Sequence, residues 1–258
     1  MYIAADVNHP NPRDNDSPFV AAVVGSINWP WCNRYIAKIR YQAHRNEQIE
    51  ELGDMIQELL YDYKRENKRL PDRIVFFRDG VSESQFKMVL NQELSALKGA
   101  VDQIEGYLHP PLISIIVAQK RHHTRLFLEK TPNVKENVPV KENVPAGTVV
   151  DTTIVHRWQF DFYLCSHYGL AGTSKPTHYH VLMDENKFTS DELQRLIYNL
   201  CYTFARCTRP VSLVPPVYYA DLAAYRGRCY LHGRLTARNE RRELPRVQAP
   251  VNQSMFFC

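Results

Sequence analysis

The sequence predicts an α/β protein in which a mixed β-sheet is covered by helices. Three observations support this fold class. Strand-length apolar runs come first, later apolar runs alternate with helical patterns, and 44% of the 258 residues are hydrophobic, enough for a sizeable core. Because the chain starts inside its first predicted strand, we expect it to be a fragment of a longer protein.

Strands are predicted where short apolar runs lie between turn residues or alternate with polar ones. The run RIVFFRDG is typical of a strand buried on both faces, whose tip is a usual place for chemistry in α/β proteins. The predicted strands are Tyr2–Val7, Phe19–Ser26, Tyr35–Ala43, Arg73–Gly80, Leu112–Ala118 and Asp161–Ser166.

Helices are predicted from apolar residues at helical spacing. One pattern runs from Glu47 towards Pro71, and Ser82 with Gln85 forms a capping-box pattern that opens the next helix. Two later helices are predicted around Ser190–Phe204 and Tyr218–Arg228.

Two segments differ from this alternation. The hexapeptide VKENVP occurs at 134–139 and again at 140–145, which indicates a duplication in a surface loop and not a repeat architecture. The charged segment Arg234–Arg246 is predicted to fray, whereas the apolar MFFC that ends the chain is predicted to dock.

Composition excludes several classes. No apolar run approaches the ~18–20 residues that a membrane span needs, and the N-terminus lacks the features of a secretory signal. The six cysteines form no C-x-x-C pair, so we expect free thiols in a reducing compartment, the cytoplasm with the nucleus as a second location. The net charge of +4 permits a polyanionic partner, but it is also common on solvated surfaces.

Carboxylates lie at or near the ends of several predicted elements. Asp6 is in the first strand, Glu47 follows the third, Asp79 ends the fourth, and Asp221 opens a late helix. Acids gathered at one sheet edge repel one another unless a cation joins them, and Mg²⁺ prefers carboxylate oxygens. A pair of such ions can clamp a phosphoryl displacement. The residues alone leave open that each is an ordinary loop acid. A strand-tip aspartate such as Asp79 would also suit a phosphoacceptor fold, but the chain is too long and too basic for that fold to explain the rest.

Two other motifs are weaker. GLAGTSKP lacks the glycine and lysine spacing of a phosphate-binding loop. His178 and His180 could share one strand face, and His122 and His123 are adjacent, but no matching Cys or His pair has zinc-ligand spacing. We therefore predict structural histidines rather than a zinc site.

Basic residues gather after the strand that ends near Ala118 and in two later segments. Lysines and arginines in such places, with Tyr and His nearby, are the residue types that hold a phosphate backbone, although ordinary surface charge remains an alternative. These residues are Lys120, Arg121, Arg125, Arg206, Arg209, Arg226 and Arg228.

Several longer motifs resemble the PIWI domain of eukaryotic Argonautes, in order along nearly the whole chain. They include ADVNHP, VVGSINW, FRDGVSESQF, VAQKRHHTRLF, DFYLCSHYGLAGTSKPTHYHVL and RCTRPVSLVPPVYYADLAAYRGR, and the phrases SLVPPVYYAD and GTSKPTHY look most like plant members. The resemblance implies a ribonuclease H-like fold. It also implies a PIWI domain at 1–233 that lacks its N-terminal part, a tail at 234–258, and no N-terminal, PAZ or MID domain.

The resemblance also implies catalytic residues. Asp6, Glu47, Asp79 and Asp221 fall on the family's catalytic positions, and the three aspartates on its ligands for Mg²⁺, with Mn²⁺ as an alternative. Many Argonautes have histidine where this chain has Asp221, and one plant clade has aspartate there. Aspartate suits a hard cation at least as well as imidazole does, so we predict that activity is retained.

The family's contacts to the guide backbone carry over to a second set of positions. Lys175 stands where some members have arginine, which keeps the charge but loses the bidentate fork, and Arg226 matches an arginine that reaches the 5′ phosphate of the guide. The set is Lys120, Arg121, Arg125, His167, Lys175, Arg206, Tyr218 and Arg226.

Three functions follow from the resemblance. The first is a Mg²⁺-dependent, guide-directed endoribonuclease that is active in a full-length context. The second is a module that binds guide and target RNA without cutting and silences through partners, and the third is a truncated product with little activity. The expected partners are a small guide RNA, a target RNA and silencing-complex proteins, with no membrane and a monomeric chain.

Overall fold

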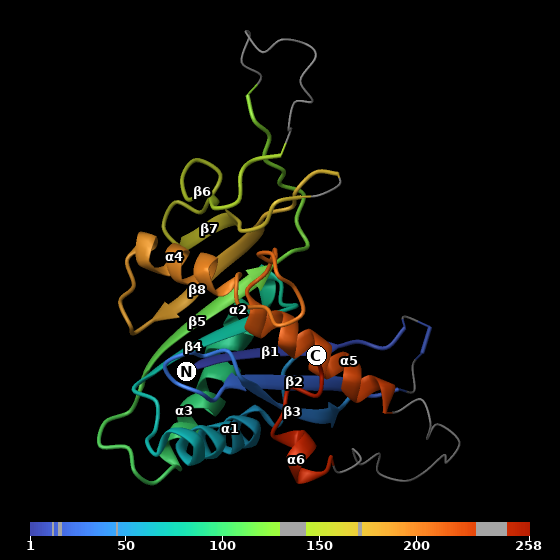
Figure 1. The fold of residues 1–258 in the computed structure, drawn as a ribbon, viewed down its shortest axis with the longest axis vertical. Helices are drawn as coiled ribbons and strands as arrows, with labels where there is room; N and C mark the ends of the chain where they lie inside the picture. Colours follow the sequence, from blue (N-terminus) through green and yellow to red (C-terminus); the bar gives the residue numbers. More distant parts are fainter. Residues whose placement is uncertain (12, 15–16, 45, 130–142, 170–171, 231–246) are drawn as a thin grey trace. The chain divides into compact units, whose positions relative to one another are not determined.

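The computed structural model describes the chain except for residues 12, 15–16, 45, 130–142, 170–171 and 231–246. Two units can be distinguished (Figure 1). The large unit comprises Met1–Val117, Leu182–Lys187 and Pro216–Cys258, and the small unit comprises Ala118–Val181 and Phe188–Pro215.

Among the described residues, eight strands form one sheet in the order β3-β2-β1-β4-β5-β8-β7-β6. The sheet is mixed, because β1 runs antiparallel to β2 and parallel to β4, and the predicted fold class is confirmed. The strands are β1 (Tyr2–Asn8), β2 (Phe19–Ser26), β3 (Tyr35–Gln42), β4 (Arg73–Asp79), β5 (Leu112–Gln119), β6 (Thr148–Val150), β7 (Phe160–Cys165) and β8 (Thr177–Asp184). The helices are α1 (Leu52–Asn67), α2 (Phe86–Met88), α3 (Leu94–Asp102), α4 (Ser190–Leu200), α5 (Pro215–Cys229) and α6 (Ala249–Asn252).

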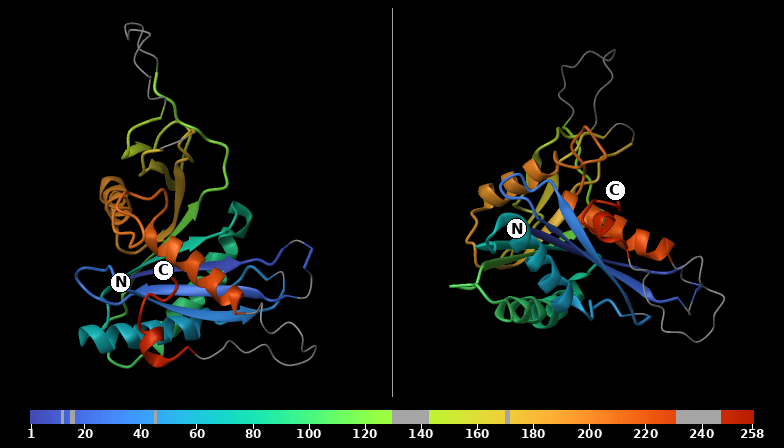
Figure 2. Two further views of the ribbon diagram at one scale, coloured as in Figure 1. Left: turned by 45° about the vertical axis from the view of Figure 1, so that its right-hand side comes forward. Right: turned by 60° about the horizontal axis from the view of Figure 1, so that its bottom comes forward.

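One face of the sheet in the large unit is covered by α1 and α3 (Figure 2). Alternate residues of β1, Ile3, Ala5 and Val7, are buried in the same apolar core as Leu59 of α1 and Leu97 of α3. Successive side chains of a strand point to opposite faces. The even positions of β1 therefore point away from this core.

Helix α5 covers the opposite face of β1–β3 (Figures 1 and 2). A Cβ placed on Gly227 would lie 2.7 Å from Ile39 Cγ2 and 2.8 Å from Val20 Cγ1, and the Tyr41 hydroxyl donates to the Gly227 carbonyl at 3.1 Å. The absence of a side chain at Gly227 thus allows α5 to approach β2 and β3 closely.

The apolar end of the chain docks as predicted. Phe257 is only 2% exposed, and its ring lies 5.9 Å from that of Tyr219 on α5. Tyr219 in turn contacts Tyr35 of β3, with ring centroids 4.9 Å apart. The C-terminal aromatic residue therefore extends the core between α5 and the sheet.

The helix that was predicted from Glu47 begins only at Leu52. Before it, the Gln42 side-chain amide donates to the carbonyls of Asn46 (2.5 Å) and Gln48 (2.9 Å) and holds the preceding residues as a loop. Ile49 fits the helical spacing in the sequence, and it is buried. It lies before the helix, however, so its side chain anchors the loop. Glu47 consequently lies in a loop.

The position predicted for Asp221 is also corrected. Helix α5 begins at Pro215 rather than Tyr218, because proline suits the first helical position, where no N–H is needed. Asp221 therefore lies in the second turn and not at the helix start. The pattern of α4 was likewise extended too far, since this helix ends at Leu200 rather than Phe204.

The capping box of Ser82 and Gln85 is confirmed. It opens a 3₁₀ turn, Glu83–Gln85, that leads into α2, and a π-helical turn, Val89–Glu93, separates α2 from α3. The wider π turn changes which residues face inward. Glu93, at the end of this turn, is therefore buried, with 2% of its surface exposed.

The small unit contains the antiparallel strands β6 and β7, the part of β8 up to Val181, and α4. The sequence analysis did not predict β6, which has only three residues. It indicated β8 only by noting that His178 and His180 could share one face of a strand. Most of the duplicated hexapeptide, 134–142, and the charged segment 234–246 lie outside the described residues.

All six cysteines are free thiols, as predicted, with Cys32, Cys165 and Cys201 buried. In the described part of the chain, no helix is both long and apolar enough to cross a membrane.

The close approach of α5 predicts that Gly227→Ala lowers the free energy of unfolding by about 1–3 kcal/mol, because the new methyl group must displace Val20 and Ile39. Gly99→Ala is the matched control, since nothing lies within 4 Å of its Cβ position in α3. It should raise stability by about 0.5–1 kcal/mol through helix propensity. Urea denaturation measures both, and a neutral Gly227→Ala would contradict the tight packing.

Candidate active site

The parallel pairing of β1 with β4 brings Asp6 and Asp79 to the same edge of the large unit's sheet. The last paired residues are Ala5 and Arg78, and each aspartate directly follows one of them. Neighbouring positions in register point to the same side. Both carboxylates therefore lie on the face opposite the core under α1 and α3.

The charges of the acids act on one another. Burial and then the charge of Asp6 raise the pKa of Asp79 from 3.8 to about 7, and Asp221 adds a smaller increase. The Gly80 N–H, which donates to Asp79 Oδ1 at 2.8 Å, opposes this shift together with Arg78. An ionised Asp79 is therefore costly in the absence of a cation.

Asp221 approaches this group from α5. Desolvation and then the charge of Asp6 raise its pKa, although the residue retains contact with solvent. Asp6 itself is 8% exposed. Asp6 is thus the carboxylate common to both interactions, and residues from β1, β4 and α5 meet around it.

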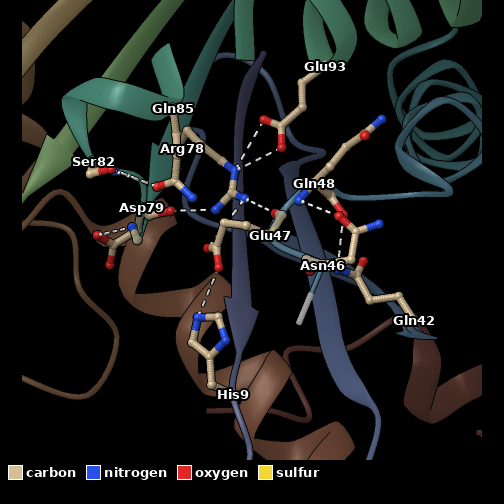
Figure 3. Close-up of polar contacts among 11 residues, drawn as sticks. His9, Gln42, Asn46, Glu47, Gln48, Arg78, Asp79, Ser82, Gln85 and Glu93 are labelled. Atoms are coloured by element: carbon tan, nitrogen blue, oxygen red, sulfur yellow. Dashed lines mark hydrogen bonds and ion pairs between the residues drawn. The ribbon is translucent and has the colours of Figure 1, made fainter. Parts of the chain in front are cut away.

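Arg78 organises the residues around the acids and has no exposed side-chain surface. Its Nε donates to both carboxylate oxygens of Glu93, at 3.1 and 3.2 Å (Figure 3). Its Nη2 donates to the Glu47 carbonyl at 2.8 Å, and its Nη1 donates to the Asp79 carbonyl. One buried guanidinium therefore ties the loop after β3 to the end of β4.

The Glu47 side chain points towards the same place. Its Oε2 lies 3.2 Å from His9 Nε2 (Figure 3), whereas its Oε1 is buried and lacks a hydrogen-bond partner. The nearest Arg78 nitrogen is 3.9 Å from Oε1. Burial, and to a lesser extent the charges of Asp6 and Glu93, raise the pKa of Glu47 against the opposing effects of His9 and Arg78.

Gly80 leaves space for these carboxylates. Its φ of +79° favours glycine, and a Cβ there would lie 3.4 Å from Asp6 Oδ1 and 3.5 Å from Glu47 Oε1. Asp6 and Glu47 thus approach the turn from two elements. The four predicted acids are all in the large unit, and the charge of Asp6 raises the pKa of each of the other three.

The sequence did not identify His9, Arg78, Glu93 or Gly80 as parts of this site. His9 and Gly80 lie in the motifs ADVNHP and FRDG and could have been found from their nearness to Asp6 and Asp79. Glu93 carries no such signal, because only the π-helical turn directs it inward.

The donor set suits a hard cation, since carboxylate oxygens are what Mg²⁺ prefers and the buried Oε1 of Glu47 needs a partner. Among the described residues, however, the one group of three whose ligand atoms all lie within 4.8 Å of one another is Asp161, His178 and His180. The predicted ligands Asp6, Asp79 and Asp221 are therefore less tightly gathered, as expected for like charges.

Several predicted RNA contacts meet in the small unit. Lys120 Nζ donates to the Lys175 carbonyl at 2.6 Å. Burial, and to a lesser extent the charges of Lys175 and Arg125, lower the pKa of Lys120 to about 8. Burial and the charge of Lys120 also lower the pKa of His167. Lys120, Lys175 and Arg125 thus form one electropositive group, and His167 lies beside it.

The other predicted contacts are more dispersed. Arg121 and Arg206 are exposed on the small unit, and Arg226 is exposed on α5, where Tyr218 is half-buried. The two on α5 lie on the helix that carries Asp221.

The Piwi domain family profile matches residues 1–232. The chain belongs to the Piwi domain family. Protein argonaute 7 from Arabidopsis thaliana is 54% identical over all of this chain and 26% of its own length, and protein argonaute 7 from Oryza sativa subsp. japonica is 55% identical over all of this chain and 25% of its length. The chain thus spans about a quarter of these relatives.

Solved structures agree with this assignment. The C-terminal lobe of a budding yeast Argonaute superposes with a TM-score of 0.89 at 32% identity, covering this whole chain and 53% of that one. Kluyveromyces polysporus Argonaute with a guide RNA gives the same score and identity over this whole chain and 32% of its own. The predicted ribonuclease H-like fold of a Piwi domain is confirmed.

The raised pKa of Asp79 predicts how pH affects stability. The folded chain holds this proton up to about pH 7, whereas the unfolded chain releases it near 3.8. Stability without metal should therefore fall as pH rises through this window, and it should fall less in Asp79→Asn. Thermal melting with and without Mg²⁺ measures this, and each kcal/mol shifts Tm by about 2–4 °C. Parallel pH profiles of the two proteins would contradict the shift.

Proposed function

We propose that this Piwi domain performs small-RNA-guided endonucleolytic cleavage of RNA within a full-length Argonaute. The observation that carries the proposal is the convergence of Asp6, Asp79 and Asp221 from three separate elements. The charge of Asp6 raises the pKa of the other two carboxyl groups. Gathering carboxylates in this way is unfavourable without a cation, so the arrangement is better explained by ion binding than by folding alone.

Asp6, Asp79 and Asp221 would hold Mg²⁺, with Mn²⁺ as an alternative, and Glu47 would complete the site. When bound, two such ions would stabilise the attacking and leaving oxygens of a phosphodiester. Aspartate at position 221 keeps the donor set entirely oxygen, which suits these hard cations.

The chain's own residues prepare this site. Arg78 fixes the backbone at Glu47 and at Asp79, and His9 orients one carboxylate oxygen of Glu47. The other oxygen, Oε1, is directed beside Gly80 without a hydrogen bond of its own. Glu47 is thereby held near Asp6 before substrate arrives, which lowers the conformational cost of assembling the site.

The electropositive group of Lys120, Lys175 and Arg125, together with the adjacent His167, would bind the phosphate backbone of a guide RNA. Arg226 on α5 would reach the 5′ phosphate, and Tyr218 would contact the backbone. One relative with 32% identity was solved with a guide RNA, which supports this class of ligand. Target RNA and silencing-complex proteins are proposed as the further partners.

A second candidate function is guide and target binding without cleavage. The observation that favours it is that the electropositive group belongs to the small unit, whereas all four acids belong to the large unit. RNA binding by Lys120, Lys175 and their neighbours would not need the acids to hold ions.

Single-stranded RNA should bind with an affinity that falls as salt rises. Replacing the exposed Arg121 and Arg206 by alanine should reduce the salt slope by about 1.4 units if each loses one phosphate contact. The control is Arg73→Ala with Lys87→Ala, two exposed cations outside the predicted set. Fluorescence anisotropy across a salt series measures the slope. Equal slopes for both double variants would show that Arg121 and Arg206 make no RNA phosphate contacts beyond those of ordinary surface cations.

In a full-length protein rebuilt around this domain, Asp221→Ala should slow guided cleavage by at least about 100-fold while guide loading stays nearly intact. Asp221→His should retain part of the activity because imidazole can ligate a divalent ion, and Asp221→Asn should resemble alanine because it removes the charge. A single-turnover assay with a labelled target and saturating Mg²⁺ measures the rates.

The exposed Asp72 on the same unit is the matched control, and Asp72→Ala should cut at the wild-type rate. If Asp221→Ala also cuts at that rate, Asp221 does not belong to the site. If every variant and the wild type load guide but none cuts, the binding function replaces the proposal.

A further inference from the structure

A second group of potential ligands lies on the small unit, on neighbouring strands. In the antiparallel pairing of β7 with β8, Asp161 is directly opposite His180, and Tyr163 is opposite His178. Directly opposed residues share a face, and so do residues two positions apart on one strand. Asp161, His178 and His180 therefore project from the same face of the sheet.

These three side chains are buried and lie close together. Their exposed fractions are 4%, 7% and 5% for Asp161, His178 and His180. One potential ligand atom from each lies within 4.8 Å of those of the other two. The two imidazole rings have centroids 3.8 Å apart, and Asp161 Oδ2 lies 2.6 Å from His178 Nε2.

Neighbouring groups hold the ligands in place. The second oxygen of Asp161, Oδ1, accepts a hydrogen bond from the backbone N–H of His156 at 2.9 Å. The His178 ring stacks on Tyr163, with centroids 3.9 Å apart and an interplanar angle of 14°. Supports of this kind, behind the ligands, are usual in metal sites.

We propose that Asp161, His178 and His180 form a binding site for one transition-metal dication of the Zn²⁺ class. Two imidazole nitrogens and one carboxylate oxygen are zinc donors, whereas Mg²⁺ and Ca²⁺ prefer all-oxygen sites. The proposal is independent of the proposed cleavage activity, because its donors differ from those of the carboxylate group and belong to the other unit.

Metal binding would exchange one interaction for another. The proton that bridges Asp161 Oδ2 and His178 Nε2 would pass to solvent, and both atoms would then be available to the ion. The ion would connect β7 to β8. His167 lies just after β7 in the chain, and Lys175 lies just before β8. The ion would thus hold the framework of the electropositive group without touching RNA.

The test uses the 258-residue chain after removal of bound metal with a chelator. Titration with Co²⁺, a spectroscopic substitute for Zn²⁺, should produce a visible ligand-field band that saturates at one equivalent, and Zn²⁺ should abolish the band by competition. Calorimetry with Zn²⁺ should give the same stoichiometry. His180→Ala should weaken binding by at least about 100-fold.

Two controls separate this site from others. His109 is exposed, so His109→Ala should bind as the wild type does, and Asp72→Ala, at an exposed acid outside both proposed metal sites, should also leave Co²⁺ binding unchanged. The proposal is overturned if the wild type gives no saturating band, or if His180→Ala binds with the same affinity. If His180→Ala fails to fold, His180→Gln takes its place, and the wild-type band together with a rise in Tm on adding Zn²⁺ still decides.

Discussion

The buried ion pair between Arg78 and Glu93 is the constraint on which the candidate active site depends. A guanidinium with no exposed surface must be fully paired, because an uncompensated buried charge costs several kcal/mol. Arg78 meets this need with the Glu93 carboxylate and with the carbonyls of Glu47 and Asp79. The same contacts that satisfy its charge therefore fix the loop of Glu47 and the end of β4.

Around this fixed point the fold brings like charges together. The pairing of β1 with β4 aligns Asp6 with Asp79, and the glycine at position 227 lets α5 lie close enough to the sheet for Asp221 to affect Asp6. Burial, and then the charge of Asp6, raises the pKa of Asp79, so like-charge repulsion adds to the cost of ionising this buried acid. A cation would convert that repulsion into attraction, so the destabilised acids and the proposed function have one physical cause.

The two units offer chemically different ligands. The large unit presents carboxylate oxygens from β1, β4, α5 and a loop, a set that suits hard ions exchanging with substrate. On the small unit, β7 and β8 present two imidazoles and one carboxylate on a single sheet face, a set that suits a softer ion.

The sequence by itself determined the mixed sheet, most strand ranges, the Piwi resemblance and the positions of the four acids, because short apolar runs, capping residues and long motifs are local signals. The tertiary structure decided what depends on contacts between distant residues. Only packing shows that Ile49 anchors a loop, that Glu93 turns inward to Arg78, and that Asp221 lies within a helix begun by Pro215. His178 and His180 illustrate the same limit: the sequence places them on one strand face, but the pairing of β7 with β8 brings Asp161 to them, and strand pairing is set by the whole sheet.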